Sequence, residues 1–264
     1  IGIYLLLWPA LLALVISTNG DFEYADLLIV IAGSILVRSA GCVINDIWDK
    51  DLDGGVERTK TRPIPSKKLS ISESWAVFAI LGVLSLMLLS LTNTNTIYVS
   101  ICFGLMIVIY PLTKRFFIGP QIFLGLTFNP TIIIYAMTNE LNNPTMIFLY
   151  FAIAAKTIAF DSFYGLCDID DDKKLGINST PLWWGSKTLL IIAILQFTVI
   201  GLLLIVGLKA GLSFAWYIGI ILLSGFYFYQ HKLASQKNFL LAFKNNHWAS
   251  LYLLMLSGFC FLII

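Results

Sequence analysis

Two acidic stretches hold most of the groups in this sequence that could do chemistry. The first is RSAGCVINDIWDKDLDGGVERTKTRPIP, residues 38–65, and the second is DSFYGLCDIDDDKKLGINST, residues 161–180. Ten of the fifteen Asp and Glu residues lie in these two stretches. Clustered carboxylates repel one another and are unfavourable at a membrane boundary unless a cation neutralises them. This concentration of acids therefore indicates a bound cation.

Within each stretch, the spacing places oxygen-bearing side chains on one helical face. Positions four residues apart share a face, and so do positions seven and eleven residues apart. The first stripe is Asn45, Asp49 and Asp53, and the second is Asp161, Asp168 and Asp172. The pattern Asp-x-x-x-Asp occurs in both, which suggests two halves that face a shared site. We interpret the remaining acids, Asp51, Asp170 and Asp171, as solvated residues off the stripes.

The ligand types favour one metal and one kind of substrate. Hard oxygen ligands without His or Cys favour Mg²⁺, which typically links one or two carboxylates to substrate phosphates. Basic residues, which can hold the other phosphate oxygens, surround the acids: Arg58, Lys60, Arg62, Lys114, Arg115, Lys173 and Lys174. The sequence therefore predicts a diphosphate site. Arg62, in a stiff turn before Pro63, and Lys114, four residues after Tyr110, are the favoured contacts because they lie close to span ends.

Two basic residues lie deeper in apolar segments. Arg38 precedes Asn45 by two turns on the same face, and Lys156 precedes Asp161 by five residues. Ionisable residues inside a membrane are rare and usually paired or functional. Arg38 keeps its charge, so it needs an anion from the protein or from a substrate. For Lys156 two interpretations stay open, namely snorkelling and pairing with a nearby Asp.

The composition is that of a membrane protein. The hydrophobic fraction is 58%, against about 45–50% in soluble domains, and the mean hydropathy is +0.86. Nine apolar blocks are each roughly the ~20 residues that cross a bilayer, near residues 1–17, 26–47, 74–92, 96–111, 118–138, 145–164, 187–207, 212–230 and 247–264. Because backbone groups in lipid must be satisfied internally, these blocks should be helices. We predict an all-α protein with about nine spans and a single domain over residues 1–264.

Positive charge is concentrated on one set of predicted loops. Thirteen of the seventeen Lys and Arg residues lie in loops 48–73, 111–118, 165–186 and 231–246, whereas the opposite loops contribute only Lys209. This bias places both acidic loops, and the amino terminus, on the cytoplasmic side. We interpret Lys67, Lys68 and the bases of 231–246 as ordinary residues of this positive side.

The sequence offers little support for other classes of protein. The cysteines are scattered in apolar surroundings, which favours neither disulfides nor a zinc site. His231 and His247 flank one polar loop and are expected at the interface. The sequence starts at Ile1 inside an apolar run, which we interpret as a truncated start and not as a signal peptide. Nothing indicates nucleic-acid binding or an obligatory protein partner.

Several segments together resemble one family. They are IGIYLLLWPA at the start, RSAGCVINDIWDKDLDGGVERTKTRPIPS, YPLTKR at 110–115 and FDSFYGLCDIDDDKKLGINST. On these segments the chain resembles the UbiA superfamily of intramembrane aromatic prenyltransferases, and most closely its 4-hydroxybenzoate polyprenyltransferase branch. The resemblance covers the first 180 residues, and 187–264 match only as apolar spans.

The resemblance implies helices around a central cavity capped by the two acidic loops. By position it implies Mg²⁺–diphosphate ligands at Asn45, Asp49, Asp53, Asp168 and Asp172. It implies a further acid of the second motif at Asp161, and a residue near the benzoate carboxylate at Arg38. Other substrate contacts are expected at Arg58, Arg62, Tyr110, Lys114 and Arg115. The chain departs from the family pattern at Lys67, at Asn178 and at Phe128-Asn129-Pro130-Thr131.

We therefore expect Mg²⁺-dependent transfer of a polyprenyl group from its diphosphate to the 3-position of 4-hydroxybenzoate, a step of ubiquinone biosynthesis. The bilayer of a bacterial or mitochondrial inner membrane would hold the enzyme, with the acidic loops on the cytoplasmic or matrix side. One alternative is another acceptor, namely homogentisate, a naphthoate or haem. An ion-coupled transporter is a second alternative, but it predicts acids near mid-membrane, whereas these acids lie at span ends.

Overall fold

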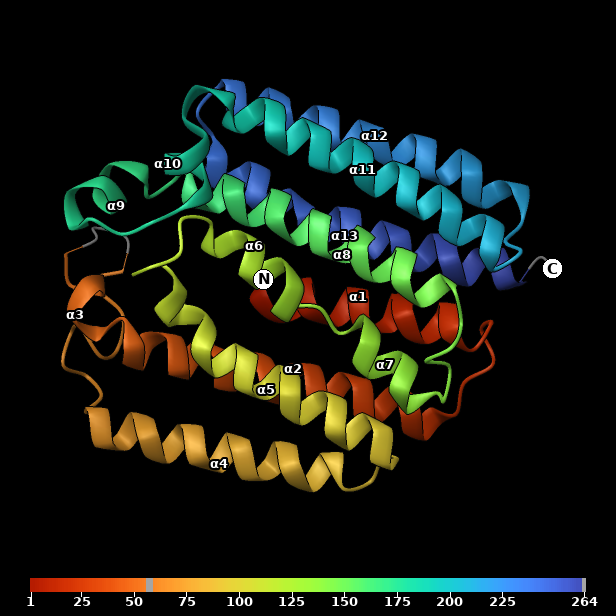
Figure 1. Ribbon diagram of the computed structural model, residues 1–264, viewed down its shortest axis with the longest axis horizontal. Helices are drawn as coiled ribbons and strands as arrows, with labels where there is room; N and C mark the ends of the chain where they lie inside the picture. The colour runs from red at the N-terminus through yellow and green to blue at the C-terminus, as the bar shows by residue number, and fades with distance from the viewer. Residues whose placement is uncertain (56–58, 263–264) are drawn as a thin grey trace.

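The computed structural model describes residues 1–55 and 59–262, and in these residues the chain is helical without strands (Figure 1). The longer helices are α1 (Gly2–Ser17), α2 (Tyr24–Trp48), α4 (Ile71–Leu89), α5 (Thr94–Thr113), α8 (Thr145–Gly165), α11 (Thr188–Lys209), α12 (Phe214–Ser235) and α13 (Phe239–Leu262). The shorter ones are α3 (Lys50–Asp53), α6 (Pro120–Thr127), α7 (Thr131–Met137), α9 (Ile169–Leu175), α10 (Thr180–Trp184) and the 3₁₀ turn η1 (Gly185–Lys187).

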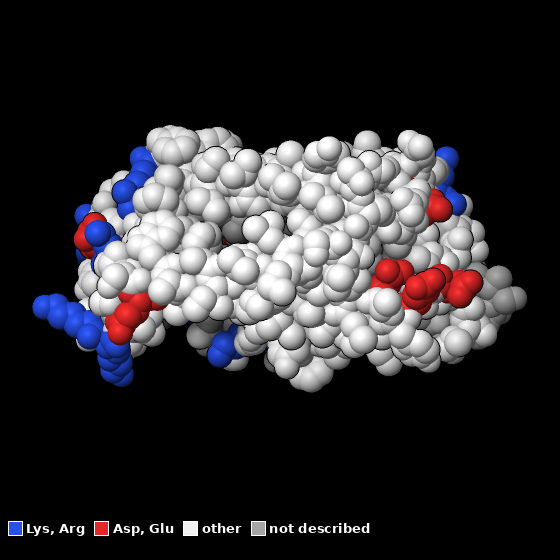
Figure 2. All heavy atoms as spheres, turned by 90° about the horizontal axis from the view of Figure 1, so that it is seen from below, with Lys and Arg blue, Asp and Glu red and all other residues white. Residues whose placement is uncertain are grey.

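The surface of the bundle is divided as a bilayer requires. On the face shown in Figure 2, most charged side chains gather toward the two ends of the long axis, and the surface between them is almost uncharged. In the described chain, six helical segments are long and apolar enough to cross a membrane. Each predicted apolar block overlaps a helix, but α1 is shorter than a full span. The exact number of nine spans therefore stays a prediction.

Two predicted boundaries differ from the structure. The segment 231–246, predicted as a loop, is almost entirely helical, because α12 continues to Ser235 and α13 begins at Phe239. The block 118–138 is divided into α6 and α7 at Phe128–Pro130. Proline lacks an N–H group and disfavours helix before it, which explains the break. Asn129 anchors the break through Nδ2, which donates to the Tyr150 carbonyl of α8 at 2.8 Å.

One half of the bundle is solid. Helices α1, α8, α11, α12 and α13 enclose a core of fully buried side chains that includes Leu12, Leu149, Leu203, Trp216 and Leu223. The Trp216 indole N–H donates to the Leu203 carbonyl at 2.9 Å, which satisfies the one polar group of that side chain. The other half is looser. There α4 packs mainly on α2 at the edge of the bundle (Figure 1).

The buried lysine contradicts both interpretations of its sequence position. Lys156 is 2% exposed and donates to the Ser250 hydroxyl of α13, with its ammonium 5.6 Å from the centroid of the Phe160 ring. It therefore neither snorkels to the interface nor pairs with an Asp of the described chain. The two histidines also hold helices together, since His231 bonds with Gln196 and His247 accepts from Trp8.

Close packing of α6 on α8 gives a first testable prediction. A Cβ atom at Gly125 would lie 2.6 Å from Ile158 Cγ1 and 2.8 Å from the Ala154 carbonyl oxygen. Gly125→Val should therefore lower the free energy of unfolding by about 1–3 kcal/mol, measured as a lower melting temperature in detergent. Gly201→Val is the matched control, because a Cβ there meets nothing within 4 Å. Equal shifts in both variants would contradict this packing argument.

Candidate active site

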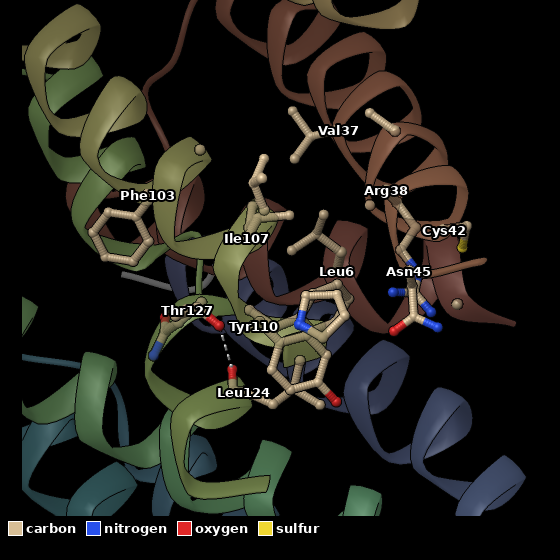
Figure 3. Close-up of a pocket in the computed structure, with 18 of the residues that line it drawn as sticks. Leu6, Val37, Arg38, Cys42, Asn45, Phe103, Ile107, Tyr110, Leu124 and Thr127 are labelled. Atoms are coloured by element: carbon tan, nitrogen blue, oxygen red, sulfur yellow. Dashed lines mark hydrogen bonds between the residues drawn. The ribbon is translucent and has the colours of Figure 1, made fainter. Parts of the chain in front are cut away.

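A single cavity of about 790 Å³ opens between α1, α2, α4, α5, α6 and α8. It is lined by nearly all the side chains that the sequence singled out: Arg38, Asn45, Asp49, Asp53, Arg62, Tyr110, Lys114, Asp161, Asp168 and Asp172. Arg38 and Asn45 of α2 and Tyr110 of α5 point into the same space (Figure 3). Two stretches that are distant in sequence therefore meet at one cavity.

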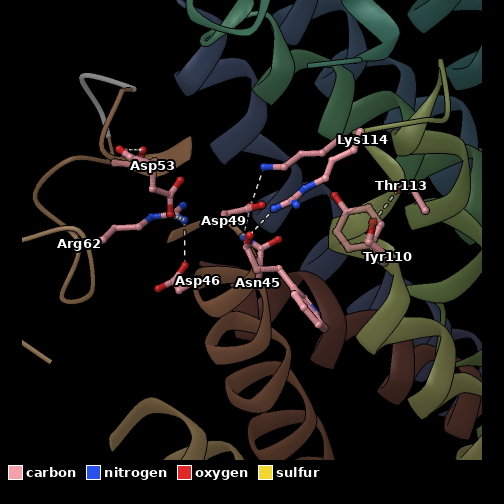
Figure 4. Close-up of polar contacts among 11 residues, drawn as sticks. Asn45, Asp46, Asp49, Asp53, Arg62, Tyr110, Thr113 and Lys114 are labelled. Carbon is pink, nitrogen blue, oxygen red and sulfur yellow. Dashed lines mark hydrogen bonds and ion pairs between the residues drawn. The ribbon is translucent and has the colours of Figure 1, made fainter. Parts of the chain in front are cut away.

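The first acidic stripe is held by hydrogen bonds across the end of α2. Asn45 Nδ2 donates to Asp49 Oδ2 at 3.0 Å, and Lys114 Nζ donates to the same oxygen at 2.6 Å (Figure 4). Asp49 is 2% exposed, and its other oxygen, Oδ1, is buried without a hydrogen-bond partner. Burial raises the pKa of the Asp49 carboxyl, although Lys114 opposes this shift. Asp49 therefore has one oxygen held by two donors and one buried oxygen without a donor.

Arg62 neutralises two further carboxylates. Its Nη1 atom lies 2.8 Å from Asp46 Oδ1 and 2.8 Å from Asp53 Oδ2 (Figure 4). Partial burial lowers the pKa of the guanidinium, but the charges of Asp53 and Asp46 outweigh burial and leave this pKa raised. The 59–70 segment is thereby fastened to the end of α2 by charge-assisted bonds, which are stronger than neutral ones.

The second acidic stretch differs from the continuous stripe that its spacing predicted. Helix α8 ends at Gly165, and Asp168 is the N-cap of α9, so a turn separates Asp161 from the other two acids. Asp172 continues the pattern, because its N–H donates to the Asp168 carbonyl at 2.8 Å. Burial raises the pKa of the Asp172 carboxyl to about 6. All three acids nevertheless line the cavity.

The two stretches are joined through the backbone beyond α9. Gly176 ends that helix with a φ of +66°, a conformation that glycine adopts without strain. The chain then turns back, and the Asn178 N–H donates to the Lys114 carbonyl at 2.9 Å. Lys114 therefore contacts the first stretch with its side chain and the second with its backbone.

These features can be compared with known proteins. A family model described as the UbiA prenyltransferase family matches residues 6–261. The chain belongs to the UbiA prenyltransferase family. It is therefore a prenyltransferase and, by its apolar helices, an integral membrane protein.

Individual relatives agree with this assignment. The 4-hydroxybenzoate octaprenyltransferase of Pseudomonas aeruginosa is 39% identical over 257 residues, which are 95% of this chain and 86% of that protein. The same-named protein of Shewanella loihica is 36% identical over 267 residues, which are 100% and 93% of the two chains.

Solved structures of UbiA homologs share the fold. The apo homolog from Aeropyrum pernix superposes with a TM-score of 0.84 at 22% identity, over 95% of this chain and 94% of that one. The homolog from Archaeoglobus fulgidus, bound to GPP and Mg²⁺, gives 0.73 at 17% identity, over 99% and 97%. The predicted all-α UbiA-type bundle is thus confirmed.

Some residues expected at the UbiA site lie elsewhere. Arg115 does not line the cavity, because its Nη2 atom donates to the Trp48 carbonyl at 2.5 Å and so caps the C-terminus of α2. Arg58 lies outside the described residues. Among the acids read as solvated, Asp51 and Asp170 are exposed and Asp171 pairs with Lys174 at 3.4 Å.

The structure also adds residues that the spacing did not reveal. Asp46 pairs with Arg62, although it lies off the stripe of Asn45. Ser179 is buried and lines the cavity, and its hydroxyl interacts with the Asp172 carboxyl. Only one feature of the sequence indicated these two residues, namely that each lies inside an acidic stretch.

The donor set fits Mg²⁺. The five expected ligands all offer oxygen and line the cavity, and the free Oδ1 of Asp49 is a buried acceptor without a donor. No three acidic, His or Cys side chains of the described chain gather closely enough to hold a metal by themselves. Mg²⁺ commonly binds through one or two carboxylates, with waters and substrate phosphates as the other ligands.

Away from the charged end, the cavity reaches the lipid-facing surface between α4 and α5. Leu86, Ile101 and Leu105 line the cavity and are 58%, 46% and 62% exposed. The two helices pack on α2 rather than on each other. Gly82 of α4 and Gly104 of α5 line this opening, and a Cβ on either would meet nothing within 4 Å. We refer to this opening as the α4–α5 window.

The Arg62 ion pairs give the second prediction. Arg62→Gln leaves Asp46 and Asp53 without their cation, which should cost about 1–3 kcal/mol. The 59–70 segment should then open more often, and thermolysin should cleave it roughly tenfold faster in membranes, because cleavage follows the open population. Lys68→Gln is the control, since Lys68 is an exposed cation of the same segment. Unchanged cleavage of the Arg62 variant would mean that the ion pairs do not hold the segment.

Proposed function

We propose that this UbiA enzyme transfers a polyprenyl group from polyprenyl diphosphate to the 3-position of 4-hydroxybenzoate, as a step of ubiquinone biosynthesis. One observation carries the proposal. The two acidic stretches, the cations Arg62 and Lys114, and the deeper Arg38 all line one cavity that is continuous with a lipid-facing opening. The names of the relatives from Pseudomonas aeruginosa and Shewanella loihica support the same reaction.

The charged end of the cavity suits a metal-bound diphosphate. Asn45, Asp49, Asp53, Asp168 and Asp172 would hold Mg²⁺, which supplies positive charge to the departing diphosphate when bound. Lys114 and Arg62 now neutralise carboxylates. They lie where they could also contact phosphate oxygens, and Arg suits such planar recognition. The homolog from Archaeoglobus fulgidus was solved with GPP and Mg²⁺ bound, which supports a prenyl diphosphate and Mg²⁺ as the bound groups.

The middle of the cavity suits a carboxylated acceptor. The Arg38 guanidinium lines the cavity and its Nε atom is buried without a hydrogen-bond partner. In the described chain no carboxylate lies within ion-pair distance of it. An unpaired cation in an apolar wall favours an anionic ligand. We assign it the carboxylate of 4-hydroxybenzoate.

The reaction then needs little covalent participation from the protein. The bond between the allylic carbon and the diphosphate oxygen breaks, and the ring carbon ortho to the phenol bonds to the allylic carbon. The proton on that ring carbon then leaves, and we assign Asp161, which also lines the cavity, as its acceptor. The apolar walls would keep water away from the electron-deficient allylic carbon.

Membrane position follows from the same charges. The loops that carry most of the Lys and Arg lie at one end of the bundle (Figure 1). We propose that this end is cytoplasmic in a bacterial inner membrane, since positive loops stay on that side. The diphosphate would then be bound from the cytoplasmic side while the prenyl tail stays in lipid.

Removal of single carboxylates tests the proposal directly. Asp49→Ala and Asp168→Ala should each lower prenyl transfer to 4-hydroxybenzoate by at least about 100-fold, because each removes a group that stabilises the leaving charge. Radiolabelled product formation in membranes is the measurement. Asp51→Ala and Asp170→Ala are matched controls, since these acids neighbour the motifs but do not line the cavity. Unchanged product from both Asp49→Ala and Asp168→Ala would refute the proposed site.

The α4–α5 window gives a fourth prediction. If a long prenyl tail leaves the cavity there, Gly82→Phe or Gly104→Phe should lower kcat/KM for an octaprenyl donor by about tenfold or more through steric conflict. A geranyl donor, which is short enough to stay inside, should be affected far less. Gly225→Phe on α12 is the control, because a Cβ there also meets nothing within 4 Å but lies away from the cavity. An equal loss for both donors would exclude the window as the exit.

A further inference from the structure

The break between α6 and α7 places an aromatic ring against the one deeply placed arginine of the cavity. The Arg38 Cζ atom lies 5.0 Å from the centroid of the Phe128 ring, within the range of a cation–π interaction. Both residues line the cavity.

Hydrogen bonds of the backbone and of neighbouring residues fix the position of Phe128. The Phe128 N–H donates to the Leu124 carbonyl at 2.7 Å as the last bond of α6. Next to it, Asn129 donates to the Tyr150 carbonyl at 2.8 Å, and the Tyr150 hydroxyl donates back to the Leu126 carbonyl at 2.9 Å. Helix α8 therefore holds the break in place, and Phe128 has little freedom to move away.

Helix α1 also restricts the movement of the Arg38 side chain. A Cβ atom on Gly2 of α1 would lie 2.7 Å from Arg38 Nε and 2.9 Å from Nη2. The guanidinium is thus close to both the α1 backbone and the Phe128 ring. Stacking occupies the face of a guanidinium and leaves its N–H edge available for a bidentate carboxylate. Because Nε is buried against Gly2, the terminal Nη groups are the ones left for a carboxylate.

From this geometry we infer that Phe128 is a positioning residue, which holds Arg38 so that its N–H edge faces the carboxylate of the aromatic acceptor. This inference rests on the proposed function, because it assumes an acceptor that carries a carboxylate. Phe128 itself need not touch the acceptor. Its ring stabilises the desolvated cation and limits its rotamers, so that less entropy is lost when the acceptor binds.

The test compares Phe128→Leu with Phe128→Tyr in membranes that contain the full chain. The leucine variant should raise KM for 4-hydroxybenzoate by about three- to thirty-fold, the range that loss of a cation–π contact implies. It should affect kcat less than KM and leave KM for the prenyl diphosphate within about twofold. The tyrosine variant keeps an aromatic face, so its KM for 4-hydroxybenzoate should stay close to that of the unmodified enzyme. Phe123→Leu, on α6 but outside the cavity lining, is the matched control.

A double variant separates positioning from a general packing defect. On an Arg38→Ala background, Phe128→Leu should raise KM for 4-hydroxybenzoate no further, because residues that act through one another are not additive. The inference is overturned if the leucine and tyrosine variants behave alike, if both substrates lose affinity equally, or if the two substitutions add. Failure of the unmodified enzyme to prenylate 4-hydroxybenzoate would refute the proposed function instead, so the two failures are distinguishable.

Discussion

The structure depends on bringing like charges together at a low-dielectric boundary. Asp46, Asp49 and Asp53 lie within one short segment, and such carboxylates repel one another unless cations intervene. Here Lys114 and Arg62 supply that charge through ion pairs of 2.6 and 2.8 Å. Both cations come from segments outside α2, so neutralisation of the acids also fixes α5 and the 59–70 segment around the cavity. The same ion pairs therefore hold both the site and this end of the bundle together.

The same pairs suit the highly charged substrate of the proposed function. A diphosphate with its metal would bring both signs of charge, so the carboxylates could exchange a cation of the protein for the metal while Lys and Arg contact phosphate. Such an exchange conserves the number of close opposite-charge contacts, which keeps the desolvation penalty small compared with binding an isolated ion.

The helical spacing of polar residues predicted contacts within one helix correctly. It did not predict contacts between residues that are distant in sequence. Asn45 and Asp49 bond as their four-residue spacing requires, because helix geometry alone sets that distance. The predicted stripe of Asp161, Asp168 and Asp172 assumed one continuous helix, but the helix ends at Gly165, close to the predicted start of the 165–186 loop. The spacing also did not predict the pairing of Asp46 with Arg62, the capping role of Arg115 or the bond of Lys156 to Ser250. Each depends on a partner distant in sequence, which spacing cannot show.

The division of the bundle into a solid and a hollow half follows from side-chain size on the facing helices. Around Trp216 and Leu203, large side chains fill the space between α8, α11 and α12. Along the cavity, α2, α4 and α5 carry glycines at Gly33, Gly41, Gly82 and Gly104, and added methyl groups there would meet nothing closer than 3.6 Å. Removal of bulk from a packed core costs stability, typically about 2–5 kcal/mol for a large aliphatic residue. The filled half must therefore carry most of the stability, which leaves the hollow half free to open toward lipid.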